Sequence, residues 1–547
     1  MKCKCLPANA VPHVTPFYAA YLEDFPRVSQ FFRHPPSVAG IQAAAREVAL
    51  RGDVRRSVAE VLREQNRRFG SGPAVFQNID RLAGGAAAIV TGQQVGLFTG
   101  PSYTIYKALA ALRVAEEITA GGLPAVPLFS LGSEDHDLAE VNHCFWSARE
   151  GLQRLELPLP GAENRSVGAL RLGESVAGLL QSAAQGLEGP DAAWVADLLR
   201  ECYRPEETLG GAFAKLFARL FADRGLILLD PLDARLHRLA APLFRRALEE
   251  HAALTSDLLA RGEELESAGF HSQVKVTPDS TLLFASVEDR RLPVRTRGAG
   301  FVVGAREFSL PELLAWLERE PQSFSPNVLL RPVMQDALLP TAAAVAGPAE
   351  TAYLAQSAVV YERLREAIPR PIPAVLPRVA FTLVDARSAL LLEKYRLDVA
   401  DVWKGRQHLR KKMEQESLPD SLMREFDAGE KSLDALLKNL EQPLEKLDKT
   451  LRGTLEAAGN KMRYQYANLR AKAGRAQDFR AGVLDTHERA LNDSLYPEHD
   501  LQERSLCLLP LLARHGRGLL AELEQHASLE CPNHKLAFLE PSAPLVA

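Results

Sequence analysis

A strand, a helix and a second strand follow one another between Ala86 and Phe129, and this order constrains the fold more than any other feature of the chain. Residues 86–90 (AAAIV) and 125–129 (AVPLF) are short apolar runs typical of buried strands, and residues 102–120 have the pattern of a helix that ends at a pair of glycines. Two strands joined by a helix lie parallel in one sheet, so the sequence predicts an α/β fold.

The chain divides into three regions that differ in composition and hydrophobic pattern. Residues 1–385 continue the alternation of short apolar runs and helical patterns, so we predict an α/β core with connecting insertions. Within it, strand-like segments separated by turns predict a small antiparallel insertion at about 270–310, followed by a capping box at Ser309–Glu312. Residues 386–495 are helical and charged, and residues 496–547 regain a mixed character. We expect this last segment to pack back onto the core.

The helical region carries an apolar seam from Leu433 to Leu469 whose members are mostly three or four residues apart. This spacing is typical of a coiled coil, and we predict a long antiparallel helical hairpin or coiled coil. Pro443 lies between seam positions and is expected to kink or start a helix there. An ordinary helical domain face is the alternative.

Composition excludes several classes of protein. The net charge of −4 gives no electrostatic footprint for nucleic acid or an anionic membrane. Six cysteines in 547 residues are too sparse for a disulfide framework, and we expect Cys3 and Cys5 to be free thiols in a frayed N-terminus. Apolar runs are too short for a transmembrane helix and the N-terminus does not resemble a signal peptide, so we expect a cytoplasmic protein.

A glycine-rich segment, residues 91–107 (TGQQVGLFTGPSYTIYK), joins the first predicted strand to its helix. Its glycines allow a close backbone approach to a ligand, and the helix N-terminus suits a phosphate or a carboxylate. Thr99, Thr104 and Lys107 add hydroxyl and ammonium donors. The segment matches neither GxGxxG nor the P-loop, and a purely structural turn is the alternative.

An acidic and histidine-rich run, residues 133–143 (SEDHDLAEVNH), follows the second predicted strand. The end of a parallel strand is the usual place for a ligand, and Asp135 and His136 are candidates for base and acid. Glu134, Asp137 and Glu140 are candidate hydrogen-bond acceptors for amines or sugar hydroxyls. His136, Asp137 and His143 could instead bind a metal, although their spacing matches no common signature, or the run could be a solvated loop.

A third polar cluster follows at residues 330–356. Arg331 could hold a carboxylate bidentately. Glu350, Tyr353 and Gln356 are spaced to share one face of a helix and could belong to a binding site. A helix cap followed by a stripe of polar residues is the alternative interpretation. A last polar group, LQER, ends at Arg504.

Together these segments resemble the cysteine ligase family of bacillithiol biosynthesis. The matching motifs are the glycine-rich segment, EDHDLAEVNH, RPVMQDALLPT, GPAETAY and LQER. The resemblance runs over nearly the whole chain and includes the helical insertion before LQER. One departure is Ser130, where the family pattern has an aromatic residue, and this puts the fit of the substrate in doubt.

The resemblance implies a Rossmann-like core, a coiled-coil domain that mediates dimerisation, and ligation of L-cysteine to glucosaminyl-malate. It also implies ATP or ADP, because the malyl carboxylate must be activated before an amine attacks it; we predict no metal. The residues that we assign to catalysis are Asp135, His136 and Lys107. Those assigned to substrate binding are Gln93, Gln94, Thr99, Gly100, Tyr103, Thr104, Glu134, Asp137, Asn142, His143, Arg331, Gln335, Asp336, Glu350 and Tyr353. Those assigned to the nucleotide are Tyr496, Gln502 and Arg504.

Two other functions remain open at this point. One is a metal-dependent hydrolase or deacetylase that uses the EDHD run and His143. The other is a non-catalytic nucleotide-binding scaffold whose coiled coil recruits partners.

Overall fold

The computed structural model describes residues 1–547 except 49, 417, 419, 479–482, 530 and 541–547. The chain forms two compact units. An α/β unit contains Cys3–Phe381 and Glu503–Leu536, and a helical unit contains Met1–Lys2, Thr382–Gln502 and a stretch that begins at Ala537. The chain passes from one unit to the other within three short strands, β1 (Lys2–Cys5), β14 (Phe381–Val384) and β15 (Lys535–Phe538). Among the described residues, no helix is long and apolar enough to cross a membrane.

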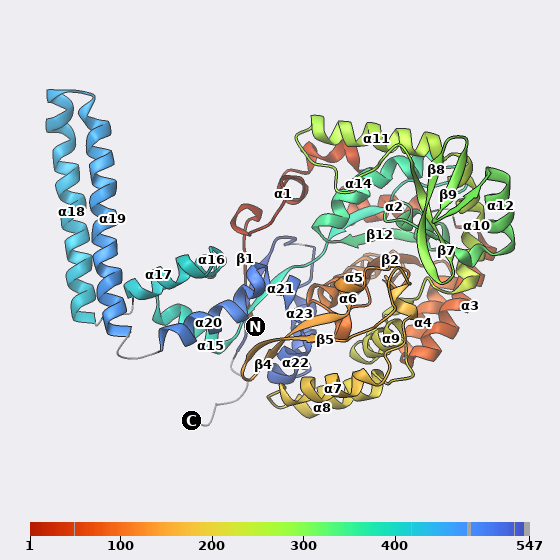
Figure 1. The fold of residues 1–547 in the computed structure, drawn as a ribbon, viewed down its shortest axis with the longest axis horizontal. Helices are drawn as coiled ribbons and strands as arrows, with labels where there is room; N and C mark the ends of the chain where they lie inside the picture. Colours follow the sequence, from red (N-terminus) through yellow and green to blue (C-terminus); the bar gives the residue numbers. More distant parts are fainter. Residues whose placement is uncertain (49, 417, 419, 479–482, 530, 541–547) are drawn as a thin grey trace. The chain divides into compact units, whose positions relative to one another are not determined.

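A five-stranded sheet forms the centre of the α/β unit, in the order β13-β12-β2-β3-β6 (Figure 1). All neighbouring strands are parallel. The predicted strand–helix–strand unit is β2, α5 and β3, and Ile89 of β2 pairs with Pro127 of β3. The parallel α/β core predicted from the sequence is therefore confirmed. The strands are β2 (Ala87–Gln93), β3 (Ala125–Leu131), β6 (Ile227–Leu229), β12 (Thr341–Ala346) and β13 (Ala374–Pro377).

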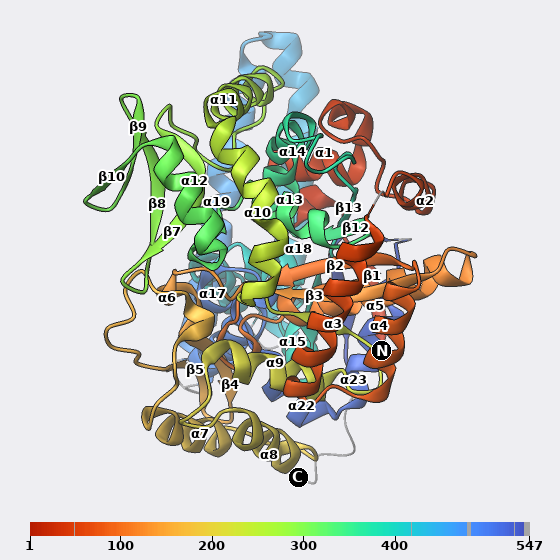
Figure 2. The same cartoon turned by 90° about the vertical axis from the view of Figure 1, so that its right-hand side faces the viewer.

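Helices pack against the sheet because its strands are mostly apolar and buried and need cover on both faces. Those in contact with the sheet are α2 (Val38–Arg46), α3 (Gly52–Phe69), α4 (Pro73–Ala83), α5 (Tyr103–Ala120) and α14 (Pro348–Arg363) (Figure 2). The other helices of eight or more residues in this unit, apart from α12, are α1 (Pro16–Glu23), α7 (Ser175–Gln185), α8 (Ala192–Cys202), α9 (Leu209–Leu220), α10 (Ala234–Glu249), α11 (His251–Ser267), α13 (Arg331–Leu338) and α23 (Gly518–Gln525).

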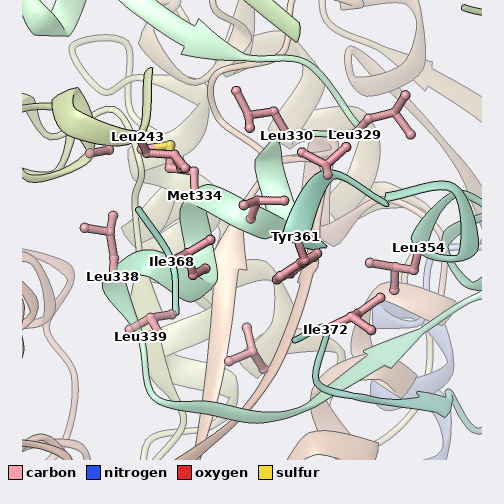
Figure 3. Close-up of a cluster of buried hydrophobic side chains, with 14 of the residues drawn as sticks. Leu243, Leu329, Leu330, Met334, Leu338, Leu339, Leu354, Tyr361, Ile368 and Ile372 are labelled. Carbon is pink, nitrogen blue, oxygen red and sulfur yellow. The ribbon is translucent and has the colours of Figure 1, made fainter. Parts of the chain in front are cut away.

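A buried apolar cluster supports α13 and α14 (Figure 3). Met334 and Leu338 come from α13, and Leu354 and Tyr361 come from α14. Leu339 follows α13 and is fully buried. These side chains fix the two helices that carry the third polar cluster of the sequence.

An antiparallel sheet in the order β10-β9-β8-β7-β11 forms a separate layer of the α/β unit. Four of its strands occupy the segment for which the sequence predicts an antiparallel insertion. The capping box is also confirmed, because Ser309 and Glu312 bond to each other's backbone at the start of α12 (Leu310–Arg319). The strands are β7 (Ser280–Val287), β8 (Arg290–Arg297), β9 (Gly300–Val303), β10 (Arg306–Phe308) and β11 (Phe324–Pro326), and a separate hairpin pairs β4 (His143–Ala148) with β5 (Gly151–Glu156).

The helical unit contains the predicted antiparallel hairpin, formed by α18 (Asp420–Leu447) and α19 (Leu451–Asp478) (Figure 1). Ion pairs cross it, such as Arg463 to Asp434 at 2.9 Å. Pro443 does not start a helix, because α18 continues through it. The chain instead reverses after Leu447, where Asp448 accepts a hydrogen bond from the Thr450 N–H at 2.8 Å. The other helices are α15 (Ala386–Lys394), α16 (Val399–Trp403), α17 (Arg406–Glu416) and α20 (Leu484–Leu495).

The N-terminus of the α/β unit is tied to its C-terminal segment. Cys5 forms a disulfide with Cys531, and the Leu6 N–H donates to the carbonyl of His534 at 2.9 Å. The expectation of a frayed terminus with two free thiols is therefore wrong for Cys5, whereas Cys3 is free. Sequence spacing could not reveal this pair, because its members are 526 residues apart.

Candidate functional site

A cavity of about 670 Å³ opens at the carboxyl ends of β2, β3 and β12. Its wall includes Gln93 at the end of β2, Ser130 near the end of β3 and Ala346 at the end of β12. In a parallel sheet this edge is where ligands bind, because loops of variable sequence leave the strands there. The volume lies within the range of about 300–1,000 Å³ typical of small-molecule sites.

The glycine-rich segment contributes only part of its length to this cavity. Gln93, Gln94, Tyr103 and Lys107 line it. Thr99, Gly100 and Thr104 do not, and both threonines are fully buried. Thr99 adopts a left-handed backbone with φ of 82°, which turns the loop back into the protein.

Lys107 is buried and fully occupied by protein acceptors. Its Nζ lies 2.9 Å from the Gly92 carbonyl, 2.7 Å from Gln93 Oε1 and 2.5 Å from Glu350 Oε2. Burial lowers the pKa of Lys107, and the neighbouring Glu350 carboxylate partly opposes this effect. Glu350 also caps α14 through the Gly347 N–H at 2.7 Å. Because an ammonium has three donors, Lys107 joins β2 to α14 and has no donor left for a ligand.

The acidic and histidine-rich run divides between the cavity and its surroundings. Glu134, Asp135 and Glu140 line the cavity, whereas His136, Asp137, Asn142 and His143 do not. Asp137 instead caps the short helix α6 (Leu138–Val141) by accepting from the Glu140 N–H, and His143 begins β4. The turn after β3 and the short helix α6 thus direct Glu134, Asp135 and Glu140 to the cavity and the other four side chains away from it.

His136 faces Arg291, a buried residue of β8 in the antiparallel insertion. The Arg291 Nη1 lies 2.9 Å from His136 Nδ1, and Arg291 also packs 3.8 Å from the ring centre of Phe284. Burial and the positive charge of Arg291 lower the pKa of His136. Since a guanidinium only donates, Nδ1 accepts, and the neutral ring carries its proton on Nε2. The predicted role of His136 as a base therefore has no support from this geometry.

Asp135 is surrounded by donors. Its Oδ1 accepts from the His136 N–H at 2.7 Å and its Oδ2 from Gln94 Nε2 at 3.0 Å. Arg331 Nη2 lies 3.6 Å from the same Oδ2. Burial would raise the pKa of Asp135, but the charge of Arg331 and these hydrogen bonds hold it below its usual value. Asp135 is therefore an ionised carboxylate on the cavity wall.

Glu134 forms a buried pair with His237 of α10, which the sequence analysis did not identify. His237 Nε2 lies 3.1 Å from Glu134 Oε1 and 2.9 Å from the Pro231 carbonyl, and Nδ1 lies 2.7 Å from the Phe324 carbonyl. Because both ring nitrogens face oxygen acceptors, both carry protons, and the ring is an imidazolium. Burial alone would lower the pKa of His237, but the Glu134 carboxylate and the two carbonyls raise it.

The third polar cluster closes the cavity on the side of α13 and α14. Arg331, Gln335, Glu350 and Tyr353 line it. Asp336 does not, and it accepts from the Tyr361 hydroxyl at 2.5 Å inside the core. The helical period explains this division, because neighbouring residues on α13 point to different sides.

The predicted nucleotide residues do not lie together in one unit. Arg504 lines the cavity, beside Arg378, whose guanidinium pairs bidentately with the buried Glu503 at 2.9 and 2.7 Å. Tyr496 and Gln502 belong to the helical unit. The Gln502 amide is bound to Leu383, accepting from its N–H at 2.7 Å and donating to its carbonyl at 2.8 Å. Gln502 thus has a structural role, and Arg378 is a cavity residue that was not among the predicted site residues.

The described part of the chain holds no cluster of three or more His, Cys, Asp or Glu side chains arranged to bind a metal ion. His136 and His143, proposed as ligands in the alternative reading, make other contacts. Arg291 occupies His136 Nδ1, and the His143 ring packs edge-on against Phe145.

Comparison with known proteins finds two family matches. Residues 1–379 match the family described as bacillithiol biosynthesis BshC, N-terminal Rossmann-like domain, and residues 381–539 match its C-terminal coiled-coil domain. Three curated relatives carry the name "Putative cysteine ligase BshC". The protein of Koribacter versatilis is 42% identical over 97% of this chain and 99% of its own length. Those of Solibacter usitatus and Salinibacter ruber are 37% and 33% identical, over 98% and 97% of this chain and 99% of their own lengths.

Proposed function

The chain belongs to the bacillithiol biosynthesis BshC family, and from this premise we propose that it is a ligase that adds L-cysteine to glucosaminyl-malate by forming an amide bond. The observation that carries the proposal is the convergence of the two richest motifs on one cavity. Gln93, Gln94 and Tyr103 from the glycine-rich segment meet Glu134 and Asp135 from the acidic run there.

The charges of the cavity suit the two substrates. Each substrate carries both a carboxylate and an amine. Arg331, whose side chain is 34% exposed, is a guanidinium available to a carboxylate, and Asp135 is an ionised acceptor beside it for an ammonium. Binding both substrates side by side would lower the barrier by up to about 7–11 kcal/mol through proximity and orientation.

The reaction also needs an activated carboxyl group, because a free carboxylate does not react with an amine at neutral pH. We propose a nucleoside triphosphate as the co-substrate that supplies an acyl phosphate or acyl adenylate. Arg504 is the one predicted nucleotide residue on the cavity wall and is the candidate for contact with its phosphates. Gln502 fits this role poorly, because its amide is already bound to the backbone of Leu383.

We further propose that the protein is a cytoplasmic homodimer. The hairpin exposes apolar side chains that a monomer leaves in water, with Leu436 at 53%, Leu447 at 79% and Leu469 at 57% exposed. Burial of such a stripe against a second copy is the ordinary use of a coiled-coil seam.

The ligase proposal is tested by incubating the purified full-length protein with glucosaminyl-malate, cysteine and ATP and detecting the amide product by mass spectrometry. Asp135→Asn should reduce product formation at least tenfold, since it removes an ionised acceptor from the cavity. Asp197→Asn is the matched control, because Asp197 is an exposed aspartate of α8 that does not line the cavity. Equal activity of wild type and Asp135→Asn would contradict the proposed site.

A further inference from the structure

Two carboxylates on the cavity wall share a single amide donor. Gln94 Nε2 donates to Asp135 Oδ2 at 3.0 Å and to Glu140 Oε2 at 2.9 Å. The Gln94 Oε1 is buried and has no hydrogen-bond partner among the described residues. Carboxylates and an amide oxygen only accept, so this place suits a ligand rich in donors, and a primary ammonium has three.

The two carboxylates have unequal surroundings. Asp135 lies 3.6 Å from Arg331 and 4.0 Å from Arg291 and accepts a backbone hydrogen bond from His136 at 2.7 Å. Glu140, on α6, has neither arginine within ion-pair distance, and its side chain is only partly exposed at the cavity wall. The arginines therefore stabilise the charge of Asp135 far more than that of Glu140.

Electrostatics on Glu140 agree with this difference. Partial burial and the negative charges of Asp135 and Asp137 raise the pKa of Glu140, against the opposing charges of Lys107 and Arg331. Tyr103 also lies near it, since the charge of Glu140 is among the causes that raise the pKa of Tyr103. When the environment separates the pKa values of two neighbouring carboxyls, one remains charged and the other exchanges protons.

We propose that Gln94, Asp135 and Glu140 form a subsite for a primary amine and that Glu140 is the catalytic residue that removes a proton from it. This inference rests on the proposed ligase function and deepens it. Asp135 holds the ammonium through its fixed charge, Gln94 orients both carboxylates, and Glu140 takes the proton-transfer role for which the sequence suggested Asp135 and His136.

The proposed step balances as follows. The ammonium of the amine substrate gives one proton to the Glu140 carboxylate and becomes a neutral amine. Its nitrogen lone pair forms the C–N bond to the activated acyl carbon, and the bond from that carbon to the phosphate oxygen breaks. The second nitrogen proton leaves with the phosphate, and Glu140 returns its own proton to solvent through the open side of the cavity.

The first test compares the kinetics of Glu140→Gln, Glu140→Asp and Asp135→Asn. A general base contributes about 10²–10⁴-fold, so Glu140→Gln should lose activity on that scale in kcat with little change in KM for the amine. Glu140→Asp should recover part of kcat, and Asp135→Asn should mainly raise KM. The matched control is Glu150→Gln, an exposed glutamate in the turn between β4 and β5.

The pH profile gives a readout that a merely structural residue would not move. A base works when deprotonated, so kcat of wild type falls as the pH falls through the raised pKa of Glu140. This acidic limb should be absent from the residual activity of Glu140→Gln. If that variant keeps the wild-type kcat and limb, the assignment of Glu140 is overturned even though the ligase proposal stands.

Infrared titration tests the charge assignment without turnover and so separates the two proposals. Between pH 4.5, the ordinary value for Glu, and neutrality, the difference spectrum of wild type minus Glu140→Gln should contain a carboxylic acid C=O band. The corresponding spectrum for Glu150→Gln should not. A band lost in Asp135→Asn instead of Glu140→Gln would refute the inference, whether or not the wild type makes product.

Discussion

Replacement of His237 by Gln tests the argument that a buried imidazolium holds Glu134 at the cavity. The ring bridges three segments, with contacts of 3.1 Å to Glu134, 2.9 Å to the Pro231 carbonyl and 2.7 Å to the Phe324 carbonyl. Gln can replace at most part of these contacts and carries no charge. Removal of one partner of a buried ion pair costs about 3–5 kcal/mol, so we expect a loss of about that size in the free energy of unfolding of the α/β unit.

The pH dependence of this loss has a definite sign. The folded-state pKa of His237 is raised above the ordinary value of 6.5. The pair therefore contributes fully below pH 6.5, and its contribution decreases as the pH rises from there through the folded pKa. Each unit by which the pKa is raised corresponds to about 1.4 kcal/mol. Wild type should lose stability over this window, and His237→Gln should not.

Denaturant unfolding at several pH values measures both effects. Trp316 is a suitable fluorescent probe, because its ring centre lies 4.9 Å from that of Phe324, whose carbonyl accepts from His237. His271→Gln is the control, since His271 is exposed. A double variant with Glu134→Gln should cost less than the sum of the two single variants, because each removes the same pair. Additive costs, or an identical pH slope in wild type and His237→Gln, would refute the reasoning.

Two further predictions follow from ion pairs and exposed apolar residues elsewhere. If the hairpin mediates a dimer, the double variant Leu440→Asp and Leu447→Asp should be a monomer when its mass is measured by light scattering, whereas Lys446→Asp on the same helix should remain a dimer. A double variant that is still a dimer would show that the dimer contact lies outside the hairpin. Arg378→Gln should cost about 3–5 kcal/mol by leaving Glu503 buried without its partner. Burial raises the pKa of Glu503, but the positive charge of Arg378 outweighs this effect and lowers the pKa below 4.5. Wild type should therefore lose stability as the pH falls from 4.5 through the lowered pKa. Unfolding curves of Arg378→Gln at the same pH values should not show this loss.

The sequence predicted the parts of the fold that depend on local patterns. The strand–helix–strand unit, the capping box at Ser309 and the helical hairpin follow from hydrophobic period and local hydrogen bonding, which neighbouring residues determine. Pro443 is not a helix boundary, because α18 runs through it and ends four residues later at Leu447. The disulfide of Cys5 was missed because it depends on a contact between the two ends of the chain.

The candidate site was predicted less completely, for a related reason. Motif position placed the segments of Asp135 and Lys107 near one edge of the sheet, the family resemblance added Arg331, and all three line the cavity. It could not separate Asp135 from His136, because which side chain faces a cavity depends on the turn after the strand. His237 and Arg291 come from distant segments and only acquire a role when the chain folds around the acidic run. A single sequence gives no signal for such partners.

The helical unit leaves the α/β unit after Phe381 and returns at Glu503, and the Phe381 N–H lies 3.1 Å from Glu503 Oε2. Entry and exit are thus neighbouring points joined by a hydrogen bond. Because the two ends of the segment 382–502 are held together in this way, a longer or shorter hairpin between them leaves these ends in place. Chains of this architecture therefore have freedom to vary the reach of their hairpin while the chemistry of the sheet edge stays constant.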